Sequence, residues 1–169
     1  VTATSFSGDG SNLSGVGFSQ DSTGKLVAGD GAGDAIDSDT CFNVMIGCNA
    51  GKTNCAGDHN LFLGCNAGCL LTSGGHNLMI GKCAGRCITT GTYNIAFGVA
   101  AMSGGSATTG QANVAIGRFA GNCICSGQRN VVLGDYAGQD ITSGSCNIFM
   151  GLASGCASTT GCANIALGV

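Results

Sequence analysis

The chain contains no proline, no tryptophan and no glutamate, and only 9% of its 169 residues are charged. Soluble domains average about 25% charged residues and about 7% glycine, whereas this chain has 32 glycines. With so few strong helix formers, the composition argues against a helical protein. A hydrophobic fraction of 44% and a net charge of −3 argue against disorder. The composition therefore favours a turn-rich, all-β structure.

Long hydrophobic runs and basic clusters are also missing. No apolar run approaches the roughly 18 residues of a membrane span, and the amino terminus lacks the pattern of a signal peptide. Residues 1–40 carry six aspartates and one lysine, whereas the rest of the chain is slightly basic without a basic stripe. We expect neither nucleic-acid binding nor membrane insertion. Because the sequence ends at "NIALGV", partway through a recurring phrase, we interpret it as a piece of a longer protein.

The recurring phrase is an asparagine followed by three apolar residues and a glycine. Its copies are 17 residues apart, except for one spacing of 19, and "KLVAGDGAG" at Lys25 is a degenerate earlier copy. Two glycine columns never change within the complete units, which indicates corners that need positive φ or close backbone approach. One unit therefore predicts two short strands and two tight corners, or one turn of a β-solenoid. The asparagines should stack as a ladder of side-chain amides; they are Asn43, Asn60, Asn77, Asn94, Asn113, Asn130, Asn147 and Asn164.

The fold prediction is an all-β, parallel β-solenoid or β-roll with turns of about 17 residues, in a homotrimeric fibre. Residues 1–24 are predicted to be a connector or amino-terminal fibre segment. Residues 25–169 form the repeat domain, which we expect to continue beyond this sequence. Its turns start near residues 25, 43, 60, 77, 94, 113, 130, 147 and 164. We expect a bulged loop near Met102 to Ala107 to absorb the two extra residues of the longer unit.

The apolar triplets predict an interface, because successive residues of a strand face opposite sides. We expect the first and third residues of each triplet to fill the solenoid interior. The second residues would then form an exposed apolar stripe, which soluble monomers rarely tolerate, so another chain should cover it. Cover by other parts of the same protein is the alternative. The predicted interface residues are Met45, Phe62, Met79, Ala96, Ala115, Val132, Phe149 and Ala166.

"NVAIG" and its variants, in tandem with "TTG" spacers, resemble two related families. One is the head of trimeric autotransporter adhesins, a left-handed parallel β-roll trimer. The other is the repeat region of bacteriophage tail fibres. The phrase "SFSGDGSNLSGVG", residues 5–17, is similar to a phrase of marine phage fibres, especially those that infect cyanobacteria. The resemblance favours a phage tail fibre and implies no catalytic residue, although 12 cysteines are more than either family usually has.

From the resemblance we expect a structural rod of a phage tail fibre or virion appendage that supports host attachment. Its partners would be two further copies of the chain, other fibre or baseplate proteins, and a host-surface glycan or protein. Arg118, Phe119, Asp135 and Tyr136 are the candidates for a glycan contact. The alternative is a bacterial surface adhesin or extracellular filament of the same β-roll type, located at the cell surface rather than in a virion. An ice-binding solenoid fits less well, because the threonine pairs are adjacent rather than alternating.

The cysteines leave three interpretations open: most are small buried hydrophobic residues at crowded corners, some form disulfides within or between chains, or some form a zinc site. Cys48 and Cys65 share a column on neighbouring turns and meet the Cα distance of a disulfide, but parallel side chains fit the disulfide dihedral poorly. Cys146 and Cys162 lie one turn apart in neighbouring columns and are the better disulfide candidate.

Other titratable residues give no site. His59 and His76 share a column that should lie at the surface, and the acidic stretch 29–39 lacks the spacing of a calcium loop. No nucleophile motif or paired carboxylate indicates an enzyme. We therefore predict no catalytic residue, no metal ligand and no cofactor.

Overall fold

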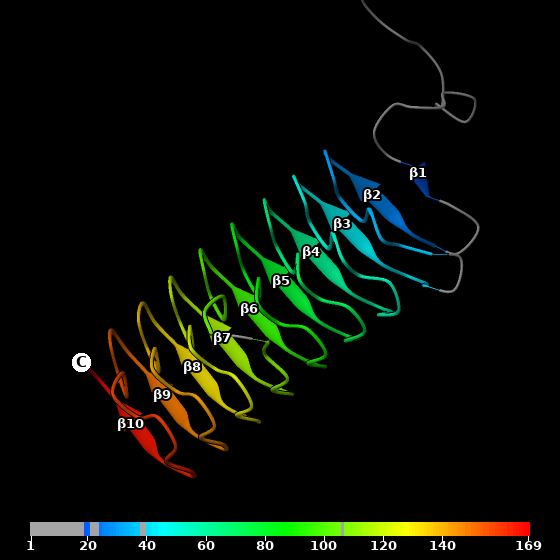
Figure 1. Ribbon diagram of the computed structural model, residues 1–169. Coiled ribbons are helices and arrows are strands. Elements are labelled where there is room, and N and C mark those ends of the chain that lie inside the picture. Colours follow the sequence, from blue (N-terminus) through cyan, green and yellow to red (C-terminus); the bar gives the residue numbers. More distant parts are fainter. Residues whose placement is uncertain (1–18, 21–23, 38–39, 106) are drawn as a thin grey trace, which may run out of the picture.

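The computed structural model describes residues 19–20, 24–37, 40–105 and 107–169. The described chain is all-β, and its strands form one sheet in chain order (Figure 1). Strands β2 to β10 pair in parallel and build a solenoid of about eight turns, whereas β1 pairs antiparallel with β2. The strands are β1 Ser19–Gln20, β2 Leu26–Ala28, β3 Val44–Ile46, β4 Leu61–Leu63, β5 Leu78–Ile80, β6 Ile95–Phe97, β7 Val114–Ile116, β8 Val131–Leu133, β9 Ile148–Met150 and β10 Ile165–Leu167. The predicted all-β solenoid is confirmed.

Each strand begins one residue after the first residue of a repeat, so the repeat sets the register. Val44 pairs with Leu61, Leu61 pairs with Leu78, and the same correspondence continues along the sheet. The degenerate copy obeys it as well, because Leu26 pairs with Val44. Lys25 thus stands in the position of the asparagines. The predicted connector, residues 1–24, lies mostly outside the described residues.

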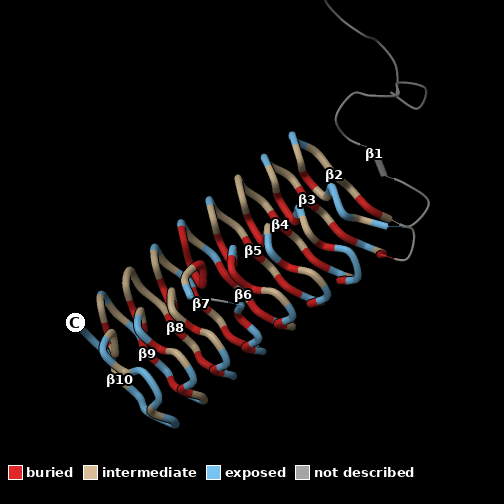
Figure 2. The backbone as a smooth tube through the Cα atoms, viewed as in Figure 1, coloured by how far each residue is buried: buried red, intermediate tan, exposed pale blue. Residues whose placement is uncertain are grey.

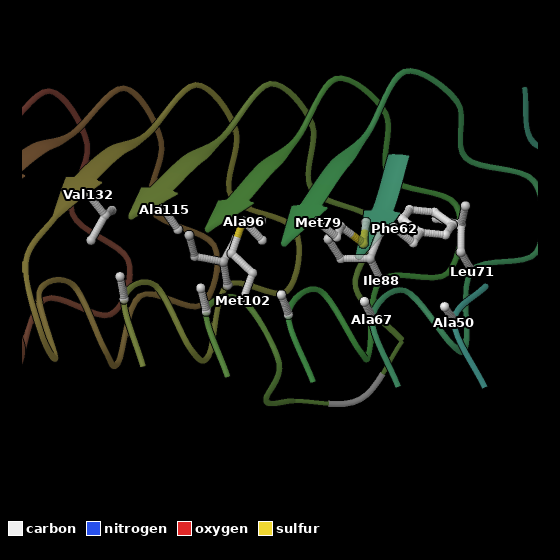
Figure 3. Close-up of a cluster of buried hydrophobic side chains, with 14 of the residues drawn as sticks. Ala50, Phe62, Ala67, Leu71, Met79, Ile88, Ala96, Met102, Ala115 and Val132 are labelled. Carbon is white, nitrogen blue, oxygen red and sulfur yellow. The ribbon is translucent and has the colours of Figure 1, made fainter. Parts of the chain in front are cut away.

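The two extra residues of the longer turn leave the sheet undisturbed. Ile95 of β6 pairs with Val114 of β7 in the register of the other turns, although 19 residues separate them. Thr108 restores the second side of the solenoid through a bridge to Ile88. This turn has no leucine or isoleucine in the inner column that faces the sheet, and the fully buried Met102 fills that space (Figure 3).

The core is narrow and runs along the solenoid axis. The second residues of the strand triplets point inward and meet an alanine column and a column of larger apolar residues (Figure 3). Leu71, Ile88, Ile124 and Ile141 of that last column are fully buried. Each turn therefore contributes only about three apolar side chains to the core.

The predicted orientation of the apolar triplets is wrong: the second residue of each triplet faces the core, and the first and third face outward. The predicted interface residues Met45, Phe62, Met79, Ala96, Ala115, Val132 and Phe149 are at most 1% exposed within one chain, and Ala166 packs against the same core. The first and third residues, predicted to be interior, are half-buried or exposed in every triplet. The physical reason is the asparagine before each triplet. Because its amide faces inward, alternation turns the next residue outward and the one after it inward.

The asparagine side chains form a continuous ladder. The Oδ1 atom of each asparagine accepts a hydrogen bond from the backbone N–H of the next asparagine, at 2.9–3.0 Å. The Nδ2 atom donates to the carbonyl oxygen of the second corner glycine of its own turn, at 2.8–3.0 Å. From Asn77 onward, Nδ2 also donates to the Oδ1 of the preceding asparagine. No buried side-chain nitrogen or oxygen of the described residues lacks a partner.

The first corner glycine is required on two counts, and Gly81 illustrates both. Its φ is +130°, where residues with a side chain are strained. A Cβ atom there would lie 2.5 Å from the carbonyl oxygen of Gly98 on the next turn. The second corner glycines differ: at Gly74 no positive φ is involved, but a Cβ atom would lie 2.1 Å from the carbonyl oxygen of Gly91.

We predict that Asn113→Asp lowers the free energy of unfolding by about 3–5 kcal/mol at neutral pH, because it places an unpaired carboxylate in the core. Asn113 donates to Gly127 and Asn94 and accepts from Asn130; a carboxylate keeps the acceptor and loses both donors. Burial should raise the pKa of this carboxyl in the folded state. Lowering the pH then restores stability, since the protonated acid can donate. Chemical denaturation at two pH values measures the effect.

The exposed Gln111→Asp provides the matched control for the ladder variant. It should leave stability within about 0.5 kcal/mol. Equal unfolding midpoints for the two variants would contradict the ladder.

We predict that Gly81→Ala destabilises the fold by at least about 2 kcal/mol, from backbone strain and the clash with the next turn. The neighbouring Lys82→Ala, at an exposed position, should be nearly neutral. Thermal unfolding followed by circular dichroism would distinguish them. A Gly81→Ala chain as stable as the parent would show that the corner is looser than described.

Candidate interaction surface

The outward face of the parallel sheet is an uninterrupted apolar strip. It consists of the first and third residues of the strand triplets, and we call it the apolar strip. Its members are Leu26, Ala28, Val44, Ile46, Leu61, Leu63, Leu78, Ile80, Ile95, Phe97, Val114, Ile116, Val131, Leu133, Ile148, Met150, Ile165 and Leu167. None is charged or polar, and none is buried within the chain (Figure 2).

Strand geometry gives the strip its size. Three residues span about 10 Å along a strand, and nine strands about 4.8 Å apart span about 38 Å. A flat apolar patch of about 400 Å² results, as large as the patches that mark interaction sites on soluble proteins. The strip residues are half-buried from β2 to β5 and at β8, and at least one per strand is exposed elsewhere, with 49% at Phe97 and 42% at Met150.

A column of rings lies one residue before the ladder asparagines. Phe42, His59, His76 and Tyr93 stack face to face, with neighbouring ring centroids 4.8–5.1 Å apart. All four have φ between 55° and 59°, a conformation that turns these side chains outward while the next residue faces the core. His59 and His76 are exposed, as predicted. The column shows that side chains at a corner keep the spacing of the strands.

A mixed polar and aromatic cluster occupies another corner on two neighbouring turns. The rings of Phe119 and Tyr136 stack at 5.3 Å. Arg118 pairs with Asp135, with 3.4 Å between Nε and Oδ2, and its guanidinium lies 4.9 Å from the centroid of the Tyr136 ring. The structure thus brings the four glycan candidates together. These four side chains interact with one another. Because Arg118 and Asp135 are about half exposed, their ion pair contributes little to stability.

The threonine column is used internally. The hydroxyls of Thr72, Thr89 and Thr142 donate to backbone carbonyl oxygens of the following turn at 3.1–3.3 Å. These hydroxyls therefore tie turns together. An ice-binding surface needs regularly spaced, free hydroxyls on a flat strand, so this arrangement does not favour that alternative.

The cysteines are all free thiols, and only Cys87 is buried. The interpretation that most of them are buried hydrophobic residues is therefore wrong. Cys146 and Cys162, the predicted disulfide pair, are exposed and unbonded; the Sγ atom of Cys162 instead accepts a hydrogen bond from the backbone N–H of Ser145 at 3.4 Å. Side chains on neighbouring turns meet within a column, and these two cysteines occupy different columns.

Chemistry-bearing groups are sparse. The described residues contain no group of three or more histidines, cysteines or acids that could hold a metal ion. A cavity at the carboxyl-terminal end, between residues 153–158 and 166–169, is lined by small and apolar residues, with Cys156 as its one titratable side chain. Within the described ranges, no helix is long and apolar enough to cross a membrane.

No protein-family model matches the chain, and neither the curated proteins nor the solved structures include a significant match.

Proposed function

We propose that this chain is the rod segment of a homotrimeric phage tail fibre or related virion appendage, which supports host attachment. The observation that carries the proposal is the apolar strip, which follows one side of a straight stack of turns. The proposed trimer and its place in a virion rest on the resemblance of the repeat phrase to phage fibres and autotransporter heads.

The strip fits a second copy of the chain better than an unrelated partner. It has no charge for a partner to complement, and it extends along the whole sheet as a narrow band. Only a partner of the same length and repeat covers all of it. Three parallel strips around one axis would enclose a dry core, while the polar corners stay in water.

Stacked turns suit a mechanical role. Parallel strands pair from β2 to β10 without a gap, so no long sheet edge is open to solvent. Each turn contacts only its neighbours, and length is set by the number of repeats. Trimerisation would then multiply weak contacts at a receptor-binding tip through avidity. A bacterial surface adhesin or extracellular filament could use the same rod, and a membrane-anchor domain on the full chain or capsid genes beside it would separate the two.

We predict that the purified chain has three times the 16.4 kDa mass of one chain, both with and without reductant. The double variant Leu63→Lys with Leu133→Lys should give a folded monomer, because lysines on the apolar strip oppose burial against another chain. Light scattering gives the mass, and circular dichroism reports the fold.

Two controls accompany the double variant. Thr90→Lys with Gln111→Lys adds the same charge at exposed positions outside the strip and should leave the trimer intact. Val132→Lys, one residue before Leu133, points into the core and should unfold the chain. A stable monomer formed by the unmodified chain would refute the proposal.

A further inference from the structure

Cys48 and Cys65 form a stacked pair of thiols at an accessible corner. Each follows the first corner glycine of its turn, and they are the one pair among the 12 cysteines that shares a column on adjacent turns. The backbone N–H of Asn66 donates to the carbonyl oxygen of Cys48 at 2.8 Å, which holds the two corners in register. Partial desolvation and then the neighbouring Cys65 thiol, which contacts Cys48, raise the pKa of Cys48. Cys48 is exposed and Cys65 half-buried.

The spacing of the stack decides what this pair can bind. A disulfide needs Cβ atoms about 3.5–4.5 Å apart, which is shorter than the separation of about 4.7–4.9 Å between neighbouring strands. Corner columns keep the longer spacing, as the 4.8 Å between the rings of His59 and His76 shows. Two metal–sulfur bonds of about 2.3 Å each, placed in line, span about 4.6 Å. The stack thus disfavours a direct S–S bond and matches a single ion between two sulfurs.

We propose that Cys48 and Cys65 bind one soft, two-coordinate metal ion of the Cu(I) type, with one thiolate from each turn. Thiolates are the ligands that select Cu(I). Zinc requires about four ligands, and this corner offers two. Binding is Cu(I) plus two thiols giving a bis-thiolate complex of charge −1 and two protons. The site lies outside the apolar strip and does not depend on the proposed assembly.

Neighbouring groups support the charged complex. Asn66 donates from Nδ2 to the Sγ atom of Cys65 at 3.3 Å, so a donor already points at one ligand. The same column continues with Lys82 on the turn after Cys65. The Lys52 ammonium also favours the thiolate of Cys48, whereas Asp30 on the preceding turn opposes it. Because both ligands must lose protons, affinity should fall as the pH is lowered.

The test is an anaerobic competition for Cu(I) between the full chain, kept reduced with ascorbate, and the chromophoric chelator bicinchoninate. We expect the tightest Cu(I) equivalent to be lost in Cys48→Ser and in Cys65→Ser, with at least a tenfold fall in affinity. Cys55→Ser and Cys162→Ser remove exposed thiols that share no column with a cysteine on an adjacent turn, and they should retain this equivalent. X-ray absorption of the protein with one Cu(I) should show two sulfur ligands.

Two results would overturn the proposal. One is an equal loss of affinity in all four variants, which would mean that Cu(I) is shared among surface thiols. The other is a Cys48–Cys65 disulfide formed in the folded protein by hydrogen peroxide and found by peptide mapping, since the proposed spacing of the two thiols disfavours it. Circular dichroism of each variant confirms that the fold is kept, as expected for substitutions at accessible corners.

Discussion

The asparagine ladder is the interaction on which the rest of this structure depends. A single side chain performs two tasks in each turn. Its Oδ1 holds the backbone of the following turn, and its Nδ2 donates to the second corner glycine, three residues before the next asparagine. The first bond holds neighbouring turns together and the second closes each turn at its last corner. Aspartate lacks the donor and leucine lacks both donor and acceptor, so neither could replace the asparagine in the ladder.

Much else follows from this inward amide. It sets the phase of each strand, which turns the second residue of the triplet inward and leaves the first and third outside. The second corners stack so closely that a Cβ atom at Gly74 would collide with the carbonyl oxygen of Gly91 on the next turn. The core that results is narrow, and the apolar residues it cannot contain form a strip on the outside. In this chain the exposed strip is a consequence of how the turns are closed.

Sequence periodicity predicted the turn length, the strand over each apolar triplet and the tolerance of the longer unit, because identical residues recur wherever the backbone repeats. The second strand predicted for each unit was wrong: among the described residues that side of the solenoid has only the bridge between Ile88 and Thr108. Periodicity did not predict which face of each strand lies inside. Apolar residues such as Val, Ile, Leu and Met occupy both faces, and alternation alone does not tell the inner face from the outer one. The inward asparagine was the available signal. The left-handed corners before the asparagines were missed as well, where His59, Tyr93 and Ala112 have φ near +57°. Different residue types occupy this position in different repeats, so the sequence has no glycine there to indicate a positive φ. Met102 was missed because it fills the core only where the loop differs.

Hydrogen exchange of side-chain amides tests the central claim most directly. In a folded sample, the Nδ2 protons of Asn77, Asn94, Asn113, Asn130 and Asn147 should be protected from exchange, because each is buried and hydrogen-bonded on two sides. The half-buried corner residue Asn122, whose Nδ2 is outside the ladder, supplies an internal reference that should exchange quickly. Strong protection confined to the ladder is the predicted result. Rapid exchange of the ladder amides in a folded chain would contradict the account.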